Sequence, residues 1–325
     1  MCKFKSGIIL KNKCVLSQEH EESHSNLLYG LKIEDTLENA RRVFVRAELV
    51  PPDGNWWTDP DIWSFNVDQD ILPDWYNEDP KRYEEEFREE VKSWVKTHIF
   101  VNQKKKELPE GYYYLKNCNI EKISGKSQVC MIGTIIGTVK DESVVFSMSE
   151  HSSIEKLCDN AIVIEAEDNS IIRKMTGSSK VGFLNMNSVV EEMGEYSSIG
   201  MMNDKSLVYN MREQSIVRNM NQESEVRSMY DQTQVIIMNG YSSINKMIDC
   251  SSVNDARDNS IILEMTDNSS IKYAFDNTII EKMTGYSFIS QLQDKAEVKE
   301  ILGEAIVRKI NFGTASTLLT ANKTE

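Results

Sequence analysis

The sequence predicts a mainly β fold: a parallel β-solenoid of nonapeptide repeats, two to each 18-residue coil, that follows a small α+β N-terminal domain. Three observations lead to this prediction. From about residue 134 the chain repeats every nine residues, the same residue types return at the same places, and the first hundred or so residues lack this period. A period of nine excludes helical repeats, which need about 34 to 47 residues, and indicates short strands joined by turns.

The repeat is clearest in four consecutive units: SIVRNMNQE (215–223), SEVRSMYDQ (224–232), TQVIIMNGY (233–241) and SSINKMIDC (242–250). Position 1 is small and usually Ser, position 3 is aliphatic, position 6 is usually Met, and position 8 is most often Asp or Gly. Twenty in-frame units start at Thr134 and end with the unit that begins at Ala305, after two shifted units at Cys118 and Ser127. Eleven coils would form a rod of roughly 50 Å at the spacing of paired strands.

Each position has an expected structural role. We expect positions 1 to 6 to form the strand, with positions 1 and 3 pointing inward. Position 8 makes the turn, because Asp and Gly tolerate the left-handed backbone of tight turns. Position 6 is Met in every second unit from Met175 to Met283, whereas the intervening units admit Ala and Leu, which indicates two facing sheets. We interpret the Met column as core packing in preference to a copper(I) site.

The region before the repeats has its own pattern of elements. GIILKNKCVL (7–16) predicts two strands, and RVFVRAELV (42–50) predicts a third. A polar helix is expected across HEESH, a short helix near Asp35 or Thr36, and a long amphipathic helix from Asp79-Pro80, before a linker at Lys104 to Lys106. The expected domains are residues 1–110 for the α+β domain, 111–313 for the solenoid and 314–325 for a C-terminal tail or cap.

Composition bounds the function. With 37 basic and 51 acidic residues the net charge is -14, which disfavours direct binding of nucleic acid or an anionic membrane and favours a basic partner. The six cysteines are widely spaced without a C-x-x-C pair, so we expect free thiols in a reducing compartment. No apolar stretch approaches the length of a signal peptide or a membrane span, so the expected location is cytoplasmic.

The stretch HEESH (20–24) matches H-E-x-x-H, in which one helical face offers two imidazoles to zinc and a glutamate to the zinc-bound water. Its flanks are polar and nothing apolar follows until Leu27, so we expect a chance match. The chain is therefore expected to bind no zinc at His20 and His24, to use no cofactor and to have no catalytic residue. A zinc hydrolase remains the remote alternative.

Two sets of residues are candidates for binding a partner. In the N-terminal domain, aromatic residues beside carboxylates suit a basic peptide or cation, although core tryptophans and turn aspartates explain the pattern better; this set is Trp56, Trp57, Trp63, Asp59 and Asp61. In the solenoid, a column of outward apolar residues at position 2 can mark an interface; this set is Val189, Leu207, Ile216, Ile261, Ile279 and Phe288.

A family resemblance accompanies these patterns. RVFVRAELVPPDG, FNVDQDILPDWY and the helix that follows them, joined to D-N-S-x-I/V-type nonapeptides, resemble a family of uncharacterised proteins from bacteria and their phages or mobile elements. The units of that family are closer to DNSTVEAYG, so the Met-rich position 6 departs from its pattern. The resemblance implies a cargo or accessory protein and no known reaction.

The expected function is that of a non-enzymatic interaction scaffold whose solenoid binds a protein partner. The alternative is an acidic inhibitor that mimics nucleic acid and occupies the groove of a host enzyme that binds DNA or RNA. A mimic needs carboxylates along one side with few intervening lysines. The last coil keeps apolar residues and lacks an obvious capping helix, so we also expect a homodimer through the C-terminal end.

Overall fold

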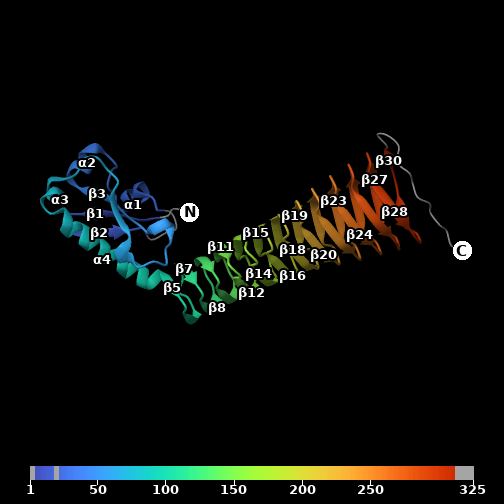
Figure 1. Ribbon diagram of the computed structural model, residues 1–325, viewed down its shortest axis with the longest axis horizontal. Helices are drawn as coiled ribbons and strands as arrows, with labels where there is room; N and C mark the ends of the chain where they lie inside the picture. Colours follow the sequence, from blue (N-terminus) through green and yellow to red (C-terminus); the bar gives the residue numbers. More distant parts are fainter. Residues whose placement is uncertain (1–3, 18–21, 312–325) are drawn as a thin grey trace. The chain divides into compact units, whose positions relative to one another are not determined.

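The computed structural model describes residues 4–17 and 22–311, which belong to two compact units (Figure 1). The N-terminal unit comprises the residues up to Asn102 together with Gly111–Lys116. The solenoid unit comprises Gln103–Glu110 and the residues from Asn117 onward. The chain thus enters the solenoid unit at Gln103, returns to the N-terminal unit at Gly111 and enters the solenoid unit again at Asn117. The sequence had indicated a single boundary at residue 110.

An antiparallel sheet of four strands, in the order β2-β1-β3-β4, forms the centre of the N-terminal unit. The strands are β1 (Lys5–Leu10), β2 (Lys13–Leu16), β3 (Phe44–Val50) and β4 (Ser64–Val67). Ile8 and Ile9 point to opposite faces of β1 and both are fully buried, so the sheet is covered on both sides. The strands predicted in GIILKNKCVL and RVFVRAELV are confirmed.

Helices cover the two faces of this sheet. The helices are α1 (His24–Gly30), α2 (Leu37–Arg42), α3 (Asp74–Glu78) and α4 (Pro80–His98), with short 3-10 turns η1 (Pro52–Gly54) and η2 (Pro60–Ile62). On one face Leu28 of α1 packs against Ile8 and Phe44. On the other face α4 lies so close to β1 that a Cβ at Gly7 would come within 2.5 Å of the Phe87 ring. The predicted amphipathic helix from Asp79-Pro80 is confirmed.

The solenoid unit consists of parallel strands that stack into two facing sheets of about 12 turns (Figure 1). We call them the even sheet and the odd sheet after their strand numbers. The even sheet comprises β6 (Lys104–Glu107), β8 (Asn119–Ile123), β10 (Ile135–Val139), β12 (Ser153–Leu157), β14 (Ile171–Met175), β16 (Val189–Met193), β18 (Leu207–Met211), β20 (Glu225–Met229), β22 (Ser243–Met247), β24 (Ile261–Met265), β26 (Ile279–Met283) and β28 (Glu297–Ile301).

The odd sheet lies opposite the even sheet and has the same parallel order. Within the solenoid unit it comprises β9 (Gln128–Ile132), β11 (Val144–Ser149), β13 (Ile162–Ala166), β15 (Lys180–Leu184), β17 (Ser198–Met202), β19 (Ile216–Met220), β21 (Gln234–Met238), β23 (Ser252–Ala256), β25 (Ser270–Ala274), β27 (Phe288–Gln293), β29 (Ile306–Val307) and β30 (Ile310–Asn311). In the N-terminal unit, β5 (Ile99–Val101) and β7 (Tyr112–Lys116) also pair in parallel.

Successive strands alternate between the two sheets, which confirms the predicted solenoid with two repeats in each coil. The regular strands span positions 2 to 6 and not 1 to 6, because the Ser at position 1 still belongs to the preceding turn. In β19 and its turn, Ser215, Val217 and Met220 are fully buried, whereas Arg218 and Asn219 at positions 4 and 5 face outward. Lys104 to Lys106, expected to be a linker, lie in β6, which pairs in parallel with β8.

The turns explain the acidic position 8. Every residue at this position from Asp141 to Gly303 has a positive φ between 52° and 68°. Asp and Gly adopt this conformation at low cost, which accounts for their frequency. The side chains also link neighbouring coils: Asp231 Oδ2 accepts from the backbone N–H of Glu213 at 2.9 Å, and Asp249 Oδ2 accepts from Asp231 N–H at 3.1 Å.

A second ladder runs along the turns that follow the odd strands. Asn203 Nδ2 donates to Asn185 Oδ1 at 2.8 Å, Asn221 to Asn203 at 2.9 Å and Asn239 to Asn221 at 3.1 Å. Each amide thus donates to the preceding coil and accepts from the next. Side chains at the turns therefore connect consecutive coils in addition to the backbone ladder.

Two further observations concern the chain as a whole. In the part of the chain that the structure describes, no helix is long and apolar enough to cross a membrane. No disulfide joins the cysteines within this part, which are Cys14, Cys118, Cys130, Cys158 and Cys250. Cys2 lies outside the described residues.

Candidate functional site

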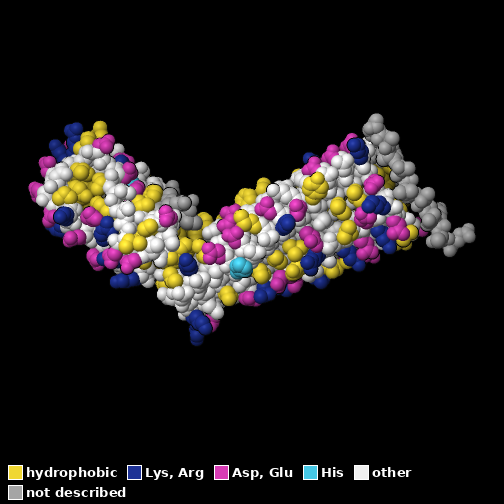
Figure 2. All heavy atoms as spheres, viewed as in Figure 1, with side chains coloured by type: hydrophobic (Ala, Val, Ile, Leu, Met, Phe, Trp, Pro, Cys, Tyr) yellow, Lys and Arg dark blue, Asp and Glu magenta, His cyan; other side chains and the backbone are white. Residues whose placement is uncertain are grey.

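The outer face of the even sheet carries charged side chains that pair with one another between neighbouring coils. Arg173 on β14 contacts Glu155 on β12 and Glu191 on β16, both at 3.0 Å. Further pairs between neighbouring coils are Lys174–Glu192, Lys246–Glu264, Lys282–Glu300 and Lys299–Glu281. Such rows of exposed ion pairs contribute little to the stability of the fold, but they leave few unpaired charges for a partner to recognise. Figure 2 shows charges of both signs interspersed with hydrophobic side chains on the visible face of the solenoid.

The odd sheet has a different outer face, where apolar side chains gather on β13, β15 and β17. Ile164, Phe183 and Met201 are 38%, 41% and 38% exposed, although positions 4 and 5 carry charged or polar residues in most other coils. Phe183 and Met201 are direct neighbours in the strand register. We define the apolar patch as Ile162, Ile164, Phe183 and Met201.

Two glycines shape the floor of the apolar patch. Gly182 and Gly200 occupy position 4 on β15 and β17, next to Ile164 on β13. A Cβ at Gly182 would lie 2.6 Å from the carbonyl oxygen of Ile164, and a Cβ at Gly200 would lie 2.6 Å from that of Gly182. There is thus no room for a side chain at either position, and the partly exposed backbone of the two glycines lies beside Phe183 and Met201.

Carboxylates border the apolar patch at both ends of its strands. We define the acidic rim as Asp159, Glu167, Asp168, Glu195 and Asp204, which lie in the turns before and after β13 and β17. Burial, followed by the charges of Glu165 and Asp168, raises the pKa of Glu167. The charges of Glu165 and Asp168 contribute to this shift, so carboxylates gather at this end of β13 and favour basic groups on a partner.

The apolar column predicted at position 2 is divided between the two sheets. Val189, Leu207, Ile261 and Ile279 lie on the outer face of the even sheet, whereas Ile216 and Phe288 lie on that of the odd sheet. Glu225 and Ser243 separate the two pairs on the even sheet. The six residues therefore form no single column, because consecutive nine-residue units face opposite sides of the rod and only units 18 residues apart are neighbours.

The tryptophan candidates are mostly in the core of the N-terminal unit. Trp56 and Trp63 are buried, and the Trp56 ring stacks on Tyr114 with centroids 4.6 Å apart. Asp59 caps η2 by accepting from the N–H of Asp61, and Asp61 pairs with Lys92 at 2.6 Å. Only Trp57 of the three predicted tryptophans is partly exposed. The geometry favours the interpretation in which tryptophans form the core and aspartates form the turns.

In the described part of HEESH, Glu22 and Ser23 are not helical and only His24 belongs to a helix. Helix α1 begins at His24, and its N-cap, Ser23, has an extended backbone with φ −102° and ψ 116°. Glu22 is buried and pairs with Lys5 at 2.8 Å while accepting from Ser6. His20 and Glu21 lie outside the described residues. Because an extended residue precedes His24, the continuous helical face required by H-E-x-x-H is interrupted.

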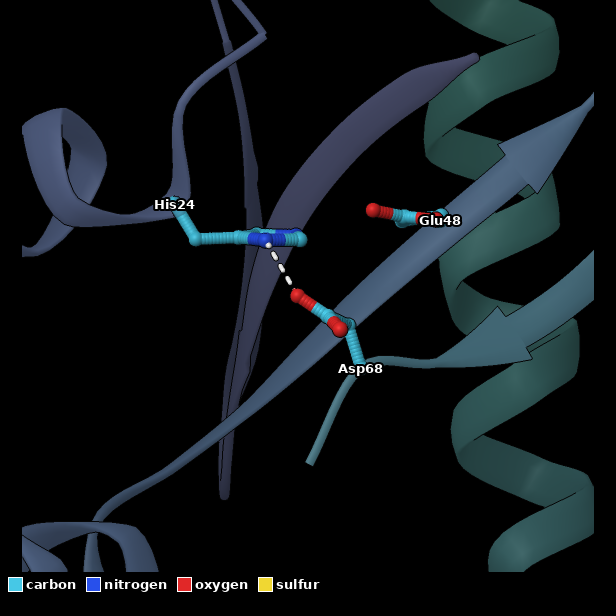
Figure 3. A group of neighbouring side chains, drawn as sticks. All are labelled: His24, Glu48 and Asp68. Atoms are coloured by element: carbon cyan, nitrogen blue, oxygen red, sulfur yellow. Dashed lines mark ion pairs between the residues drawn. The ribbon is translucent and has the colours of Figure 1, made fainter. Parts of the chain in front are cut away.

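His24 instead joins two carboxylates from the sheet, and we call this group the His24 cluster. One ligand atom from each of His24, Glu48 and Asp68 lies within 4.8 Å of the other two (Figure 3). His24 Nδ1 is 3.3 Å from Asp68 Oδ2, and His24 Nε2 is 3.2 Å from the carbonyl oxygen of Ala47. Burial raises the pKa of Glu48, while His24 lowers it and Asp68 raises it further.

Sequence reasoning missed both the apolar patch and the His24 cluster. An 18-residue comparison of outward positions 4 and 5 would have aligned Phe183 with Met201 and exposed the patch. The cluster leaves no such signal, because its members lie on different elements and their spacing follows no motif. In comparisons with protein families, curated proteins and solved structures, no match to this chain was found.

Proposed function

We propose that the protein is a non-enzymatic interaction scaffold that binds a protein partner through the apolar patch of the odd sheet. The observation that carries this proposal is the contrast between the two outer faces. The even sheet pairs its charges within the solenoid, whereas the odd sheet exposes Ile164, Phe183 and Met201 beside the backbone of two glycines. Exposed apolar groups with a polar border are typical of protein interfaces.

The acidic rim indicates the chemistry of this partner. Carboxylates at both ends of β13 and β17 would pair with Lys or Arg on either side of an apolar segment. We therefore propose a partner that inserts apolar side chains between Phe183 and Met201 and places basic residues over the rim. Apolar contacts would supply most of the affinity, and the charges would mainly raise the association rate and the specificity.

Affinity capture from a host lysate with three immobilised baits tests this proposal. The baits are the wild-type chain, a patch variant with Phe183→Ser and Met201→Ser, and a control with Leu263→Ser, which removes an apolar residue of similar exposure (43%) from the even sheet. We expect a protein that binds the wild type and the control but not the patch variant. With this protein purified, the patch variant should bind at least about tenfold more weakly, the effect of 1.4 kcal/mol.

Two results would contradict the proposal. The first is equal capture of every recovered protein by the patch variant and the wild type. The second is a partner that is lost only with the Leu263→Ser control, since this would move the interface to the even sheet. Capture at low and high salt separates the contributions, because apolar contacts persist at high salt and rim contacts weaken.

A second candidate function, the acidic mimic of nucleic acid, is supported by one observation. Between Glu195 and Asp267, position 8 supplies one carboxylate per coil along one edge of the solenoid, and each carboxylate after the first accepts the backbone N–H of the preceding member; the row is Glu195, Glu213, Asp231, Asp249 and Asp267. A partner captured through this row would be a basic DNA- or RNA-binding enzyme, and its capture would fail at high salt. The paired charges of the even sheet make the scaffold the better-supported proposal.

The setting of this function is also a proposal. The resemblance to accessory proteins of phages and mobile elements suggests association with such an element. The described cysteines form no disulfide, which supports a reducing compartment such as the cytoplasm. A partner from the same host compartment is therefore the first to be sought.

We also propose that the C-terminal end of the solenoid mediates a homodimer. Among the described residues, β28 and β29 end the two sheets, and Ile306 is 49% exposed there. An uncovered end of parallel strands favours pairing with another chain. Phe312 and the tail at 314–325 lie outside the described residues. Light scattering at micromolar concentration should give twice the monomer mass, and Ile306→Asp should reduce it; a monomeric wild type would refute the dimer.

A further inference from the structure

The His24 cluster carries an inference that is independent of the proposed scaffold function. His24 is the first residue of α1, Glu48 lies in the middle of β3, and Asp68 follows the last residue of β4. The strand register pairs Glu48 on β3 with Asn66 on β4. Just beyond β4, the backbone N–H of Asp68 donates to the backbone carbonyl oxygen of Arg46 at 3.0 Å. The sheet thus presents both carboxyl groups to the imidazole at the start of α1 (Figure 3).

The hydrogen bonding of the imidazole determines what can lie between these groups. His24 Nε2 is 3.2 Å from the carbonyl oxygen of Ala47, which can only accept, so Nε2 carries a proton and donates it there. In the neutral ring Nδ1 then has a lone pair, and this lone pair faces Asp68 Oδ2 at 3.3 Å. Two acceptors in this arrangement repel each other unless a positive charge lies between them. Histidines that bind metals commonly donate their other ring N–H to a backbone carbonyl in this way.

The spacing of the donor atoms fits a small cation. A tetrahedral zinc ion with bonds of about 2.1 Å holds its ligand atoms about 3.4 Å apart. The observed separation of His24 Nδ1 and Asp68 Oδ2, 3.3 Å, matches this value, and Glu48 brings a third ligand atom within 4.8 Å. The Glu48 carboxylate must therefore move closer than this limit to reach the ideal separation of about 3.4 Å.

Burial and charge complete the site. The His24 side chain is 9% exposed, whereas that of Asp68 is 60% exposed, so the site is closed on the helix side and open to water on the other. A neutral imidazole with two carboxylates provides two negative charges for a dication. The open side leaves room for a fourth ligand, such as water, which a tetrahedral ion requires.

We propose that His24 Nδ1, Glu48 and Asp68 bind one Zn²⁺ ion, which ties the start of α1 to strands β3 and β4. The imidazole nitrogen favours zinc over Mg²⁺ or Ca²⁺, which prefer six or more oxygen ligands. The site uses the second histidine of HEESH, but its other ligands come from the sheet and not from the motif. It therefore differs from a zinc-protease helix and from the expectation that His24 binds no metal.

Isothermal titration of the full chain with ZnCl₂ tests the proposal, in a Cys250→Ser background so that the exposed thiol does not compete. We expect one zinc per chain with a micromolar or tighter dissociation constant, and no comparable binding of MgCl₂. His24→Ala and Asp68→Asn should each weaken binding at least tenfold. Asp68 is largely exposed, so Asp68→Asn keeps the test valid if His24→Ala fails to fold.

Two controls identify the ligands. His151→Gln removes an exposed histidine of the solenoid, and His20→Ala removes the first histidine of HEESH; both should leave zinc affinity unchanged. The proposal is overturned if the chain binds no zinc, if binding survives both Asp68→Asn and His24→Ala, or if His20→Ala abolishes it.

Discussion

Substitution of Asp231 separates the two reasons for an acidic residue in the solenoid turns. Asp231 has φ 54°, and its carboxylate accepts the backbone N–H of Glu213 in the preceding coil at 2.9 Å. Alanine removes this acceptor and must adopt a left-handed backbone. Glycine removes the acceptor but adopts that backbone freely. Asparagine retains both the acceptor and the tolerance of a positive φ.

The expected destabilisation follows from these two contributions. The lost hydrogen bond costs about 1 kcal/mol, since the turn is exposed and water can replace the acceptor. The left-handed backbone costs alanine about another 1 kcal/mol. Asp231→Ala should therefore cost about 2 kcal/mol locally, Asp231→Gly about half as much and Asp231→Asn less than about 0.5 kcal/mol.

Hydrogen exchange is the suitable assay, because a solenoid can open coil by coil and a global melt averages over many coils. A local cost of about 2 kcal/mol corresponds to roughly thirtyfold faster exchange of the amides in β19 and β20. If amides of Asp231→Ala exchange as fast as those of the wild type, neither the hydrogen bond nor the left-handed backbone of Asp231 stabilises the turn. If Asp231→Asn is destabilised as much as Asp231→Ala, the negative charge stabilises the turn and its geometry does not.

Three further predictions concern the core, a thiol and the acid stability of the solenoid. Met220→Asp buries an unpaired carboxylate and should cost roughly 4 kcal/mol or more, whereas outward-facing Arg218→Ala should change stability by less than about 0.5 kcal/mol; thermal unfolding of both variants decides this. Burial and two nearby glutamates raise the pKa of the Cys14 thiol to about 12. Iodoacetamide at pH 8 should therefore modify Cys14 roughly a thousandfold more slowly than an ordinary thiol, because the thiolate is the reactive form. Peptide mass spectrometry would measure this rate. The N–H of Gly125 lowers the pKa of the Asp141 carboxyl group. The stabilisation that this carboxylate gives to the folded chain is therefore complete above the usual Asp pKa, and it is lost as the pH falls through the lower folded-state pKa. The melting temperature of Asp141→Asn should accordingly fall less steeply at acidic pH than that of the wild type.

The sequence predicted the solenoid well because each repeat position has one physical role. Ser215, Val217 and Met220 return at fixed spacing to the same environment, so the inward positions could be read directly. The strand limits were less predictable, since Ser at position 1 is buried like a strand residue but belongs to a turn. Lys104 to Lys106 were misread as a linker because their strand, β6, lies at the edge of the even sheet and has exposed side chains.

The candidate sites could be predicted only in part. The position-2 column followed the nine-residue period, but neighbours on one face are 18 residues apart, so Ile216 and Leu207 were assigned to one surface although they lie on different sheets. In the N-terminal unit, the alternation of apolar and polar residues predicts the residues that form β3, but it does not predict which segment covers that strand. The approach of His24 to Glu48 depends on where α1 begins relative to β3, for which the sequence offers no periodicity.

Hydrogen exchange of the chain with and without the partner captured by the wild-type bait shows whether the apolar patch is the binding surface. We expect binding to slow exchange in β13, β15 and β17 and in the turns of the acidic rim, while β24 and β26 on the even sheet exchange as in the free chain. Protection confined to the even sheet or to the N-terminal unit would contradict the claim that the apolar patch is the binding surface.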